Sequence, residues 1–296
     1  MDSRFVYRPE HWVDRGNYFL SNHPQGSAPW FFCRCFRLTA SSMGAAADMN
    51  KFENKYQLAL TLTKILIKEF PPDAKIRMAH GTKMEPVARD KYLAVRPGTQ
   101  VEELGLAVPK WDSRIGASVD GDVLNSRGII EIKCPMKMYW PMKKFYERCK
   151  DQGYQPSLLE HDHITDYYYV QMQANMKILE KDWCDYIIFA TDDNKMCINR
   201  VAFNPDFWDN VLYPRLNYFL EQVLRPVFNL LLAIAPDFVA SYLEINVEPL
   251  VWEDYATEHG LEHVLPALSN EAYWMPYRWE LLCQSLHVRP WPGLPV

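Results

Sequence analysis

The spacing of apolar and small residues along the chain predicts five helices. Apolar residues recur at the period of a helix that buries one face, and Ser and Thr precede a run of small residues in the first stretch. The predicted helices cover residues 39–49, 55–70, 81–95, 167–179 and 204–224. Pro71 and Pro72 are expected to end the second helix. Pro86 is tolerable only near the start of the third helix, and Pro214 marks a point where the last one can break.

Strand patterns replace the helical period in the middle of the chain. They predict strands over residues 99–109, 115–124, 128–135, 183–191 and 196–203. The residues Asn-Ser-Arg-Gly at 125–128 and Asp-Asp-Asn-Lys at 192–195 are suited to the turns of two hairpins. Helices, a strand cluster, a helix, two strands and a helix follow in that order. The sequence therefore predicts an α/β (α+β) fold, with a central mixed sheet flanked by helices.

Length and charge suggest a main domain with an acidic extension. The chain has 296 residues, of which 48% are hydrophobic and 23% charged, as in an ordinary globular protein. Residues 1–30 are expected to form an irregular lead-in and residues 31–235 the main domain. Residues 236–296 hold nine acidic and two basic residues (net −7), so the other 235 residues carry +2 from 30 basic and 28 acidic residues. The net charge of −5 therefore does not exclude a nucleic-acid partner.

The composition of residues 236–296 and the spacing of the cysteines indicate an ordered extension and a reducing compartment. Residues 236–296 are too apolar for disorder and are expected to pack on the main domain. Seven cysteines at irregular spacing, with no apolar signal segment at the start, predict an intracellular, reducing compartment such as cytoplasm or nucleus. Cys33 and Cys35 have no second pair nearby, so no zinc or iron–sulfur site is expected. No membrane partner is expected either, because the most apolar run is far shorter than the ~20 residues of a membrane span.

The stretch Gly-Ile-Ile-Glu-Ile-Lys-Cys-Pro at 128–135 places two charges on an apolar strand. Glu131 and Lys133 stand two positions apart, so they project from the same face while Ile132 faces the core. A surface ion pair on an edge strand is the ordinary explanation of such a pattern. A charge on a buried strand, however, is costly unless it is paired or coordinates a metal. The apolar neighbours therefore favour a functional site.

Two further carboxylates belong to the candidate site. Asp120 comes close to Glu131 if the second and third strands pair, and two carboxylates on adjacent strands suit Mg²⁺ or Mn²⁺. Lys133 beside such an ion would orient or help deprotonate an attacking water. Glu85 is a third candidate ligand, from the helix over 81–95. The plain alternatives are a turn aspartate at 120 and, at 85, an exposed acid near a helix start.

Four segments in this order carry a family resemblance. They are RCFRLTASS (34–42), HGTKMEPVARDKY (80–92), GASVDGDV with GIIEIKCP (116–135), and YVQMQANMKILEKDWCDYIIFA (169–190). In order and spacing they resemble the motifs of the bacteriophage lambda exonuclease branch, or YqaJ-type viral recombinases, of the PD-(D/E)XK nuclease superfamily. The resemblance covers roughly residues 30–225 and implies a restriction-endonuclease-like core.

The resemblance also implies a metal site. One divalent ion, Mg²⁺ with Mn²⁺ as the alternative, would be held by Asp120, Glu131 and the main-chain carbonyl of Ile132. Glu85 would serve a second ion. Val119 stands where the family motif usually has proline, so the strand is expected to continue instead of bending before Asp120. The catalytic residues that the resemblance implies are Glu85, Asp120, Glu131, Lys133 and Gln171.

Polar residues outside the strands complete the implied site. Gln171 and Gln173 lie two apart on a predicted helix, where only one of them can face the site squarely. Gln171 is preferred, and Gln173 stays open. Arg34 and Ser41 match the pair that in this family grips the 5′-phosphate at a DNA end, a task suited to the planar fork of arginine. Arg37 competes for that role, and a solvated surface position would explain either arginine.

A basic and aromatic segment follows the site strand directly. Residues 136–150 carry five basic residues and one acidic residue, interleaved with aromatic residues. Basic side chains follow phosphates, and aromatic rings stack on bases. The segment is expected to guide a DNA strand, and the alternative is a solvated basic loop over an aromatic cluster. The residues expected to contact DNA are Lys137, Tyr139, Trp140, Lys143, Lys144 and Arg148.

Together these observations predict a Mg²⁺-dependent exodeoxyribonuclease. It would degrade one strand of duplex DNA from its 5′ end to mononucleotides and leave a 3′ single strand for recombination or repair. One alternative is an endonuclease or nickase on the same core, which would have no use for a pocket that grips DNA ends. Another is a non-catalytic module that binds DNA ends, against which the intact Asp120, Glu131 and Lys133 argue. The resemblance further implies a ring-shaped homotrimer and a single-strand annealing protein as partner.

Overall fold

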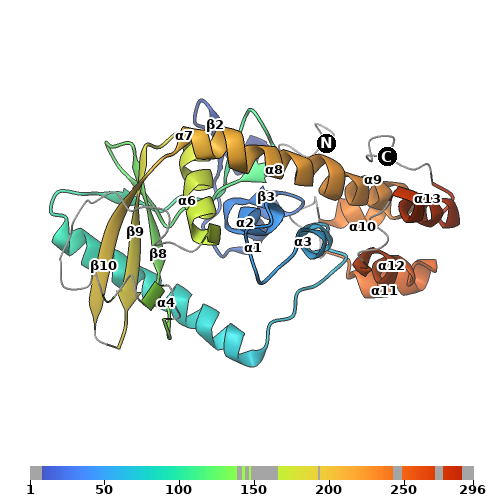
Figure 1. Cartoon of the computed structure of the whole chain (residues 1–296), viewed down its shortest axis with the longest axis horizontal. Helices are drawn as coiled ribbons and strands as arrows, with labels where there is room; N and C mark the ends of the chain where they lie inside the picture. The colour runs from blue at the N-terminus through green and yellow to red at the C-terminus, as the bar shows by residue number, and fades with distance from the viewer. Residues whose placement is uncertain are drawn as a thin grey trace.

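The centre of the molecule is a five-stranded mixed sheet in the order β10-β9-β8-β7-β4 (Figure 1). The computed structural model describes residues 9–138, 142–143, 147, 166–192, 194–242, 249–270 and 276–288, with the backbone alone for 9, 166 and 276–280. The β8–β9 pair is parallel, and the other three pairs of this sheet are antiparallel. The predicted mixed sheet is thereby confirmed. Its strands are β4 (Val101–Glu102), β7 (Gly121–Val123), β8 (Gly128–Lys133), β9 (Trp183–Ala190) and β10 (Lys195–Ala202).

Helices α4 (Pro72–Val95) and α6 (Asp166–Leu179) cover opposite faces of this sheet. In β8, Ile129 packs in the core that contains Met172 of α6. Ile130 and Ile132 pack in a separate core with Tyr92 of α4. Because side chains of a strand alternate between its faces, β8 is buried on both sides. Glu131 and Lys133 then share the α6 face with Ile129.

The hairpins agree with the prediction, but the strand predicted over 115–124 does not. The β9–β10 and β7–β8 hairpins form, and Asn125 takes the left-handed φ of 56° in the turn between β7 and β8. The single strand expected over 115–124 is instead two short strands in different sheets. β6 (Ile115–Gly116) pairs with Leu38 and Thr39, whereas β7 belongs to the central sheet. Val119 does not prolong a strand: its side chain is fully buried in the main core, which draws this segment inward.

The N-terminal residues are more regular than the sequence indicated. After a short helical turn, η2 (Pro9–His11), strands β1 (Trp12–Asp14) and β2 (Tyr18–Ser21) form an antiparallel sheet with β5 (Ala107–Pro109). The strand predicted over 99–109 is divided, since β4 belongs to the central sheet and β5 to this one. Gly105 lies between them, where a Cβ atom would stand 2.4 Å from the carbonyl oxygen of Ser21, so the close approach to β2 requires glycine.

The predicted helices before the sheet differ in their ends. The stretch 39–49 forms only two short turns, and α3 ends at Leu62 instead of residue 70. Pro71 and Pro72 do not end a helix; Pro72 begins α4, which starts before residue 81 as expected from the N-terminal preference of proline. Pro86 therefore lies inside α4, and it is tolerated there on an exposed side of the helix. The elements are α1 (Ala28–Arg34), β3 (Leu38–Thr39), η3 (Ala40–Ser42), α2 (Met43–Ala46) and α3 (Lys55–Leu62).

After the sheet, the chain forms one long helical run that crosses Figure 1 from the sheet toward the C-terminal helices. It consists of α7 (Pro205–Phe207), η5 (Trp208–Leu212), α8 (Tyr213–Tyr218), η6 (Phe219–Leu224) and α9 (Arg225–Ile234). Pro214 does not break this run. The π-helical turns η5 and η6 precede Pro214 and Pro226, which then fall in the first turns of α8 and α9, where a missing N–H is tolerated.

A second hydrophobic core joins residues of the helices after residue 235 to earlier parts of the chain. Phe238 and Trp252 pack in it with Phe36, Leu60 and Phe228. The helices of the extension are α10 (Pro236–Ser241), α11 (Trp252–His259), α12 (Val264–Ser269) and α13 (Pro276–Ser285). Across the described ranges, no helix is both long and apolar enough to cross a membrane.

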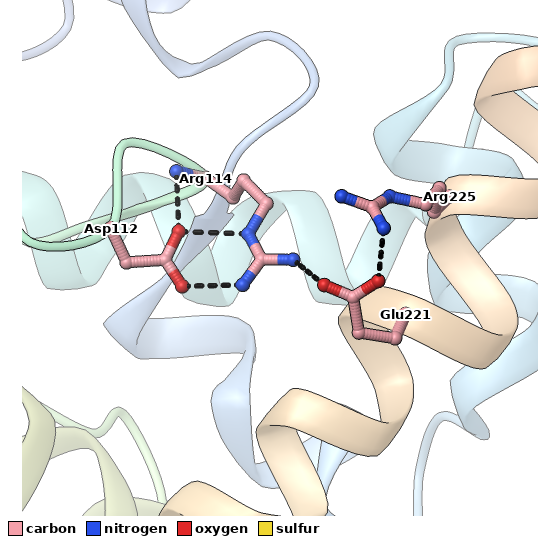
Figure 2. A network of polar contacts seen from close by, with 4 residues as sticks. All are labelled: Asp112, Arg114, Glu221 and Arg225. Atoms are coloured by element: carbon pink, nitrogen blue, oxygen red, sulfur yellow. Dashed lines mark hydrogen bonds and ion pairs between the residues drawn. The ribbon is translucent and has the colours of Figure 1, made fainter.

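A chain of ion pairs joins the loop before β6 to the long helical run (Figure 2). Arg114 contacts the Asp112 carboxylate through two nitrogens, at 2.8 and 2.7 Å, and it also pairs with Glu221. Glu221 binds Arg225 one turn further on. The carbonyl of Arg114 accepts the Leu38 N–H at 2.9 Å, so the same residue supports β3.

Replacing Arg114 with alanine is expected to lower the free energy of unfolding by about 2–3 kcal/mol, because the buried Asp112 carboxylate loses its cation. Denaturant titration of the folded protein measures the loss. The matched control is Arg127→Ala, since the Arg127–Asp182 pair is exposed on both sides and little change is expected. An equally small loss in both variants would contradict a structural role for the network.

Candidate active site

Strand β8 brings Glu131 and Lys133 together on the face that α6 covers. Glu131 is buried (1% exposed), and the Lys133 ammonium donates to its Oε1 oxygen. The Lys133 ammonium also lies 4.9 Å from the centre of the Tyr168 ring of α6. The buried carboxylate is therefore paired, as a charge on a buried strand must be.

Asp120 lies directly before β7, opposite Glu131. The register of β7 and β8 pairs Gly121 with Ile130, so one step back places Asp120 across from Glu131. Its Oδ2 atom accepts the main-chain N–H of Ile132 at 2.6 Å. Asp122, the other acid of this segment, is instead held by Lys181. The structure thus places the Asp120 carboxylate, and not that of Asp122, beside the charged pair of β8.

Burial raises the pKa values of the acids of the site, and neighbouring carboxylates add to the effect at Glu131 and Glu85. Burial raises the pKa of Glu131 to about 7, with contributions from Asp120 and Glu85 in the same direction. Burial and the nearby Asp120 also raise the pKa of Glu85, which reaches the site from α4. Burial alone would lower the pKa of Lys133, but Glu131 and Asp120 outweigh it, so its pKa is raised and Lys133 is a cation. Arg89 also acts on Glu85 and Asp120 and lowers their pKa values, so three carboxylates share two cations, and an excess of negative charge remains when all three are ionised.

Helix α6 turns one stripe of side chains toward these residues. Tyr168 contacts Lys133, and Asn175 donates to the Oε2 oxygen of Glu131 at 3.1 Å. Gln171 stands three residues after Tyr168 and four before Asn175, so it shares their face of the helix. Gln173 points elsewhere: its amide bonds the Ala202 carbonyl at 2.9 Å and the Asn204 N–H at 2.7 Å.

The donor set fits a divalent cation of the Mg²⁺ type. The carboxylates of Asp120 and Glu131 and the carbonyl of Ile132 are hard oxygen ligands, and the excess negative charge is what such a cation would neutralise. In the described ranges, no three His, Cys, Asp or Glu side chains are already gathered tightly enough to form a metal cluster. Two of the carboxylate oxygens that could bind a cation already accept hydrogen bonds. Glu131 accepts one from the Lys133 ammonium, and Asp120 accepts one from the Ile132 N–H.

The second predicted group, Arg34 and Ser41, is linked through Thr39. The Arg34 guanidinium donates to Thr39 Oγ1 at 3.2 Å, and this oxygen lies 3.4 Å from Ser41 Oγ. The guanidinium also lies 4.2 Å from the centre of the Trp30 ring. Burial lowers the pKa of Arg34 to about 10, so it is still a cation at neutral pH. Within the described residues it has no acidic partner, an arrangement that suits an anion.

The pairing of two short strands aligns the segment of this group with the segment that leads to Asp120. Thr39 of β3 is aligned with Gly116 of β6 in a parallel pair. From Gly116 the chain continues through Ser118, whose hydroxyl accepts the Trp30 indole N–H at 3.1 Å, to Asp120. The segment with the unpaired arginine and the segment with the carboxylates therefore lie side by side.

Arg37 and the basic segment are placed differently. Arg37 is buried, and it donates to the carbonyls of Ser113 at 3.0 Å and Cys33 at 2.6 Å, so it supports the fold and does not compete with Arg34. Lys137 and Lys143 are exposed. The other residues expected to contact DNA lie outside the described residues: Tyr139, Trp140, Lys144 and Arg148.

Sequence reasoning missed several residues of this site. Trp30, Thr39 and Ser118 lie inside or beside quoted motifs, but only the β3–β6 pairing shows that they surround Arg34. Tyr168 and Asn175 lie at helical spacing from Gln171. That spacing was the signal available in the sequence for the stripe of α6 that faces the site.

The mixed sheet, with one carboxylate at the start of β7, a second on β8 and a lysine two residues after the β8 carboxylate, defines a PD-(D/E)XK nuclease fold. The YqaJ-like viral recombinase domain matches residues 29–182, just over half of the chain. The protein belongs to this family. No curated protein matches the sequence.

Solved structures of exonucleases resemble this protein. One is the alkaline exonuclease LHK-Exo from Laribacter hongkongensis, with 25% identity and a TM-score of 0.53 over 71% of this chain and 99% of that chain. Its complex with dAMP matches with the same values. A phage-related exonuclease from Haemophilus somnus 129PT is 12% identical over 66% of this chain and 96% of its own, with a TM-score of 0.49.

Proposed function

We propose that the protein is a Mg²⁺-dependent exonuclease that degrades one strand of duplex DNA in the 5′-to-3′ direction. It releases mononucleotides and leaves a 3′ single strand for recombination or repair. The observation that carries the proposal is Arg34, which has no acidic partner among the described residues and whose guanidinium bonds Thr39, on a strand that the β3–β6 pair aligns with the segment leading to Asp120. A terminal 5′-phosphate on this arginine would bring the first phosphodiester of the strand to the carboxylates.

The chemistry proposed for the site is hydrolysis by water. Asp120, Glu131 and the Ile132 carbonyl would hold one divalent ion, Mg²⁺ or Mn²⁺, and Glu85 would serve a second. When bound, such ions activate water and neutralise charge on the phosphate. Lys133, as a cation, orients the water through an N–H and stabilises the negative charge that develops on the phosphoryl oxygens.

The solved relatives support the type of reaction and product. LHK-Exo is an alkaline exonuclease, and its complex with dAMP contains a deoxynucleoside monophosphate. A mononucleotide of this kind is what stepwise cleavage from a DNA end would release from the present site.

Substrate guidance and assembly belong to the same proposal. Lys137 and Lys143 are exposed after β8, where they can follow the phosphates of a strand that leaves the site. A ring-shaped homotrimer around the duplex would keep the enzyme on its substrate through many cycles. A single-strand annealing protein would receive the 3′ strand.

The proposal is tested by comparing a linear plasmid with the same plasmid as a closed circle. In Mg²⁺, the linear form is expected to lose nucleotides steadily while the circle stays intact, and a chelator is expected to stop the reaction. Acid-soluble nucleotide and gel mobility report the two outcomes. Cleavage of the circle at a similar rate would favour an endonuclease. Binding of linear ends without any release would indicate a non-catalytic module.

A further inference from the structure

The carboxylate of Glu131 is held by two donors from two different elements. Lys133 of β8 donates to Oε1, and Asn175 of α6 donates to Oε2 at 3.1 Å. Since an ionised carboxylate only accepts hydrogen bonds, the amide nitrogen of Asn175 is the atom that faces it. With one donor on each oxygen, the plane of the carboxylate is fixed from both sides.

The surroundings of Asn175 do not explain why an amide occupies this position. The residue is fully buried (0% exposed), and its Oδ1 oxygen has no hydrogen-bond partner among the described residues. A buried amide oxygen without a partner costs free energy that an apolar side chain would not. Gln173, two residues earlier on the same helix, satisfies both ends of its amide. The contact with Glu131 is the one hydrogen bond that the side chain of Asn175 makes among the described residues.

Helix α6 thus contacts both charged residues of β8. Tyr168 lies against the Lys133 ammonium, and Asn175, two turns later, lies against the Glu131 carboxylate. If the Asn175 amide were absent, the carboxylate could turn fully toward Lys133, and the tighter ion pair would compete with a cation for its oxygens.

We infer that Asn175 is a positioning residue that holds the Glu131 carboxylate in the orientation that binds a divalent cation. The inference rests on the proposed function for the identity of the site, but it concerns cation affinity, which is measurable without DNA. Partners that orient a metal ligand typically change metal affinity by about 10- to 100-fold.

The experiment titrates the full-length protein with Mn²⁺ in the absence of DNA and follows the free ion by electron paramagnetic resonance. Asn175→Ala is expected to raise the dissociation constant about 10- to 100-fold, and Asn175→Leu, which leaves no large cavity, is expected to do the same. The matched control is Asn199→Ala: Asn199 is also buried (2% exposed), but it donates to Cys197 Sγ at 3.0 Å and not to a site residue. Its variant is expected to bind Mn²⁺ as the wild type does.

A second readout separates positioning from a general loss of structure. For nucleotide release from linear DNA, the Mg²⁺ concentration at half-maximal rate is expected to rise in the Asn175 variants, while the rate at saturating Mg²⁺ approaches that of the wild type. Mn²⁺ affinity within twofold of the wild type in both Asn175 variants would overturn the inference. Wild-type protein that binds Mn²⁺ through Glu131, as shown by loss of binding in Glu131→Gln, but releases no nucleotide would overturn the proposed function and leave the inference standing.

Discussion

Lys133→Ala is expected to lower the rate of nucleotide release from linear duplex DNA by about 10²–10³-fold, the usual effect of removing one group that stabilises charge in the transition state. The structure holds Lys133 as a cation between Glu131, Asp120 and the Tyr168 ring. No other described lysine contacts these residues. The measurement is a single-turnover rate at saturating protein, which excludes effects on binding.

The control for this variant is Lys181→Ala. Lys181 also pairs with a carboxylate in a partly buried setting, that of Asp122, but it lies at the other end of α6 from Tyr168. Thermal unfolding of both variants compares their stabilities. We expect Lys181→Ala to lose stability and to retain activity. If Lys133→Ala cut DNA at more than a tenth of the wild-type rate, the role assigned to this lysine would be contradicted.

Arg34→Gln is expected to lower kcat/KM on 5′-phosphorylated ends by about 10- to 100-fold, since hydrogen bonds to a charged group contribute about 1.5–3 kcal/mol each. Ends that carry a 5′-hydroxyl group are expected to react at the wild-type rate, because they do not use the guanidinium. The ratio of the two rates, measured on otherwise identical duplexes, is the quantity to report.

Arg37→Gln is the matched control for this second prediction. Arg37 lies three residues from Arg34, but its guanidinium is bound to the carbonyls of Ser113 and Cys33. The Arg37 variant is expected to be less stable and to keep the preference for phosphorylated ends. A preference that survived in Arg34→Gln, or disappeared only in Arg37→Gln, would show that the phosphate binds elsewhere.

The strand that carries the site was predictable because its charges interrupt an apolar run at a period of two. Ile130 and Ile132 pack toward α4 while Ile129 and Glu131 face α6, as alternation requires. The β7–β8 hairpin follows from its turn residues, and with it the approach of Asp120 to Glu131. These features depend on local sequence, which is why they could be read without a structure.

Features that depend on contacts between residues far apart in the sequence were harder to predict from the sequence. The break of the strand before Asp120 accompanies the burial of Val119 in a core shared with other elements, and the alignment of the Arg34–Thr39 segment with the segment before Asp120 results from the two-residue β3–β6 pair. Neither leaves a periodic signal. Asn175 stands among the apolar residues of a buried helix, so only its helical spacing from Gln171 pointed toward the site, and nothing in the sequence indicated its hydrogen bond to Glu131.

Prediction of the helix ends from the sequence failed for the same reason at two proline residues. Pro86 and Pro214 were expected to mark a helix start and a break, yet α4 extends before Pro86 and the long run continues through Pro214. An exposed side of α4 and a π-helical turn before α8 accommodate the missing hydrogen bonds. Such accommodation depends on how each helix packs, and the residue pattern alone does not contain it.

The central claim, removal of one strand from its 5′ end, is tested most directly by the order in which two labels leave the same strand. A linear duplex with a radioactive 5′-terminal phosphate and a tritiated 3′-terminal nucleotide is digested in Mg²⁺, and the acid-soluble counts are followed with time. The proposed function predicts that the 5′ label appears at once, as a mononucleotide, and the 3′ label only after most of the strand is gone. Early release of the 3′ label, or simultaneous release of both, would contradict it.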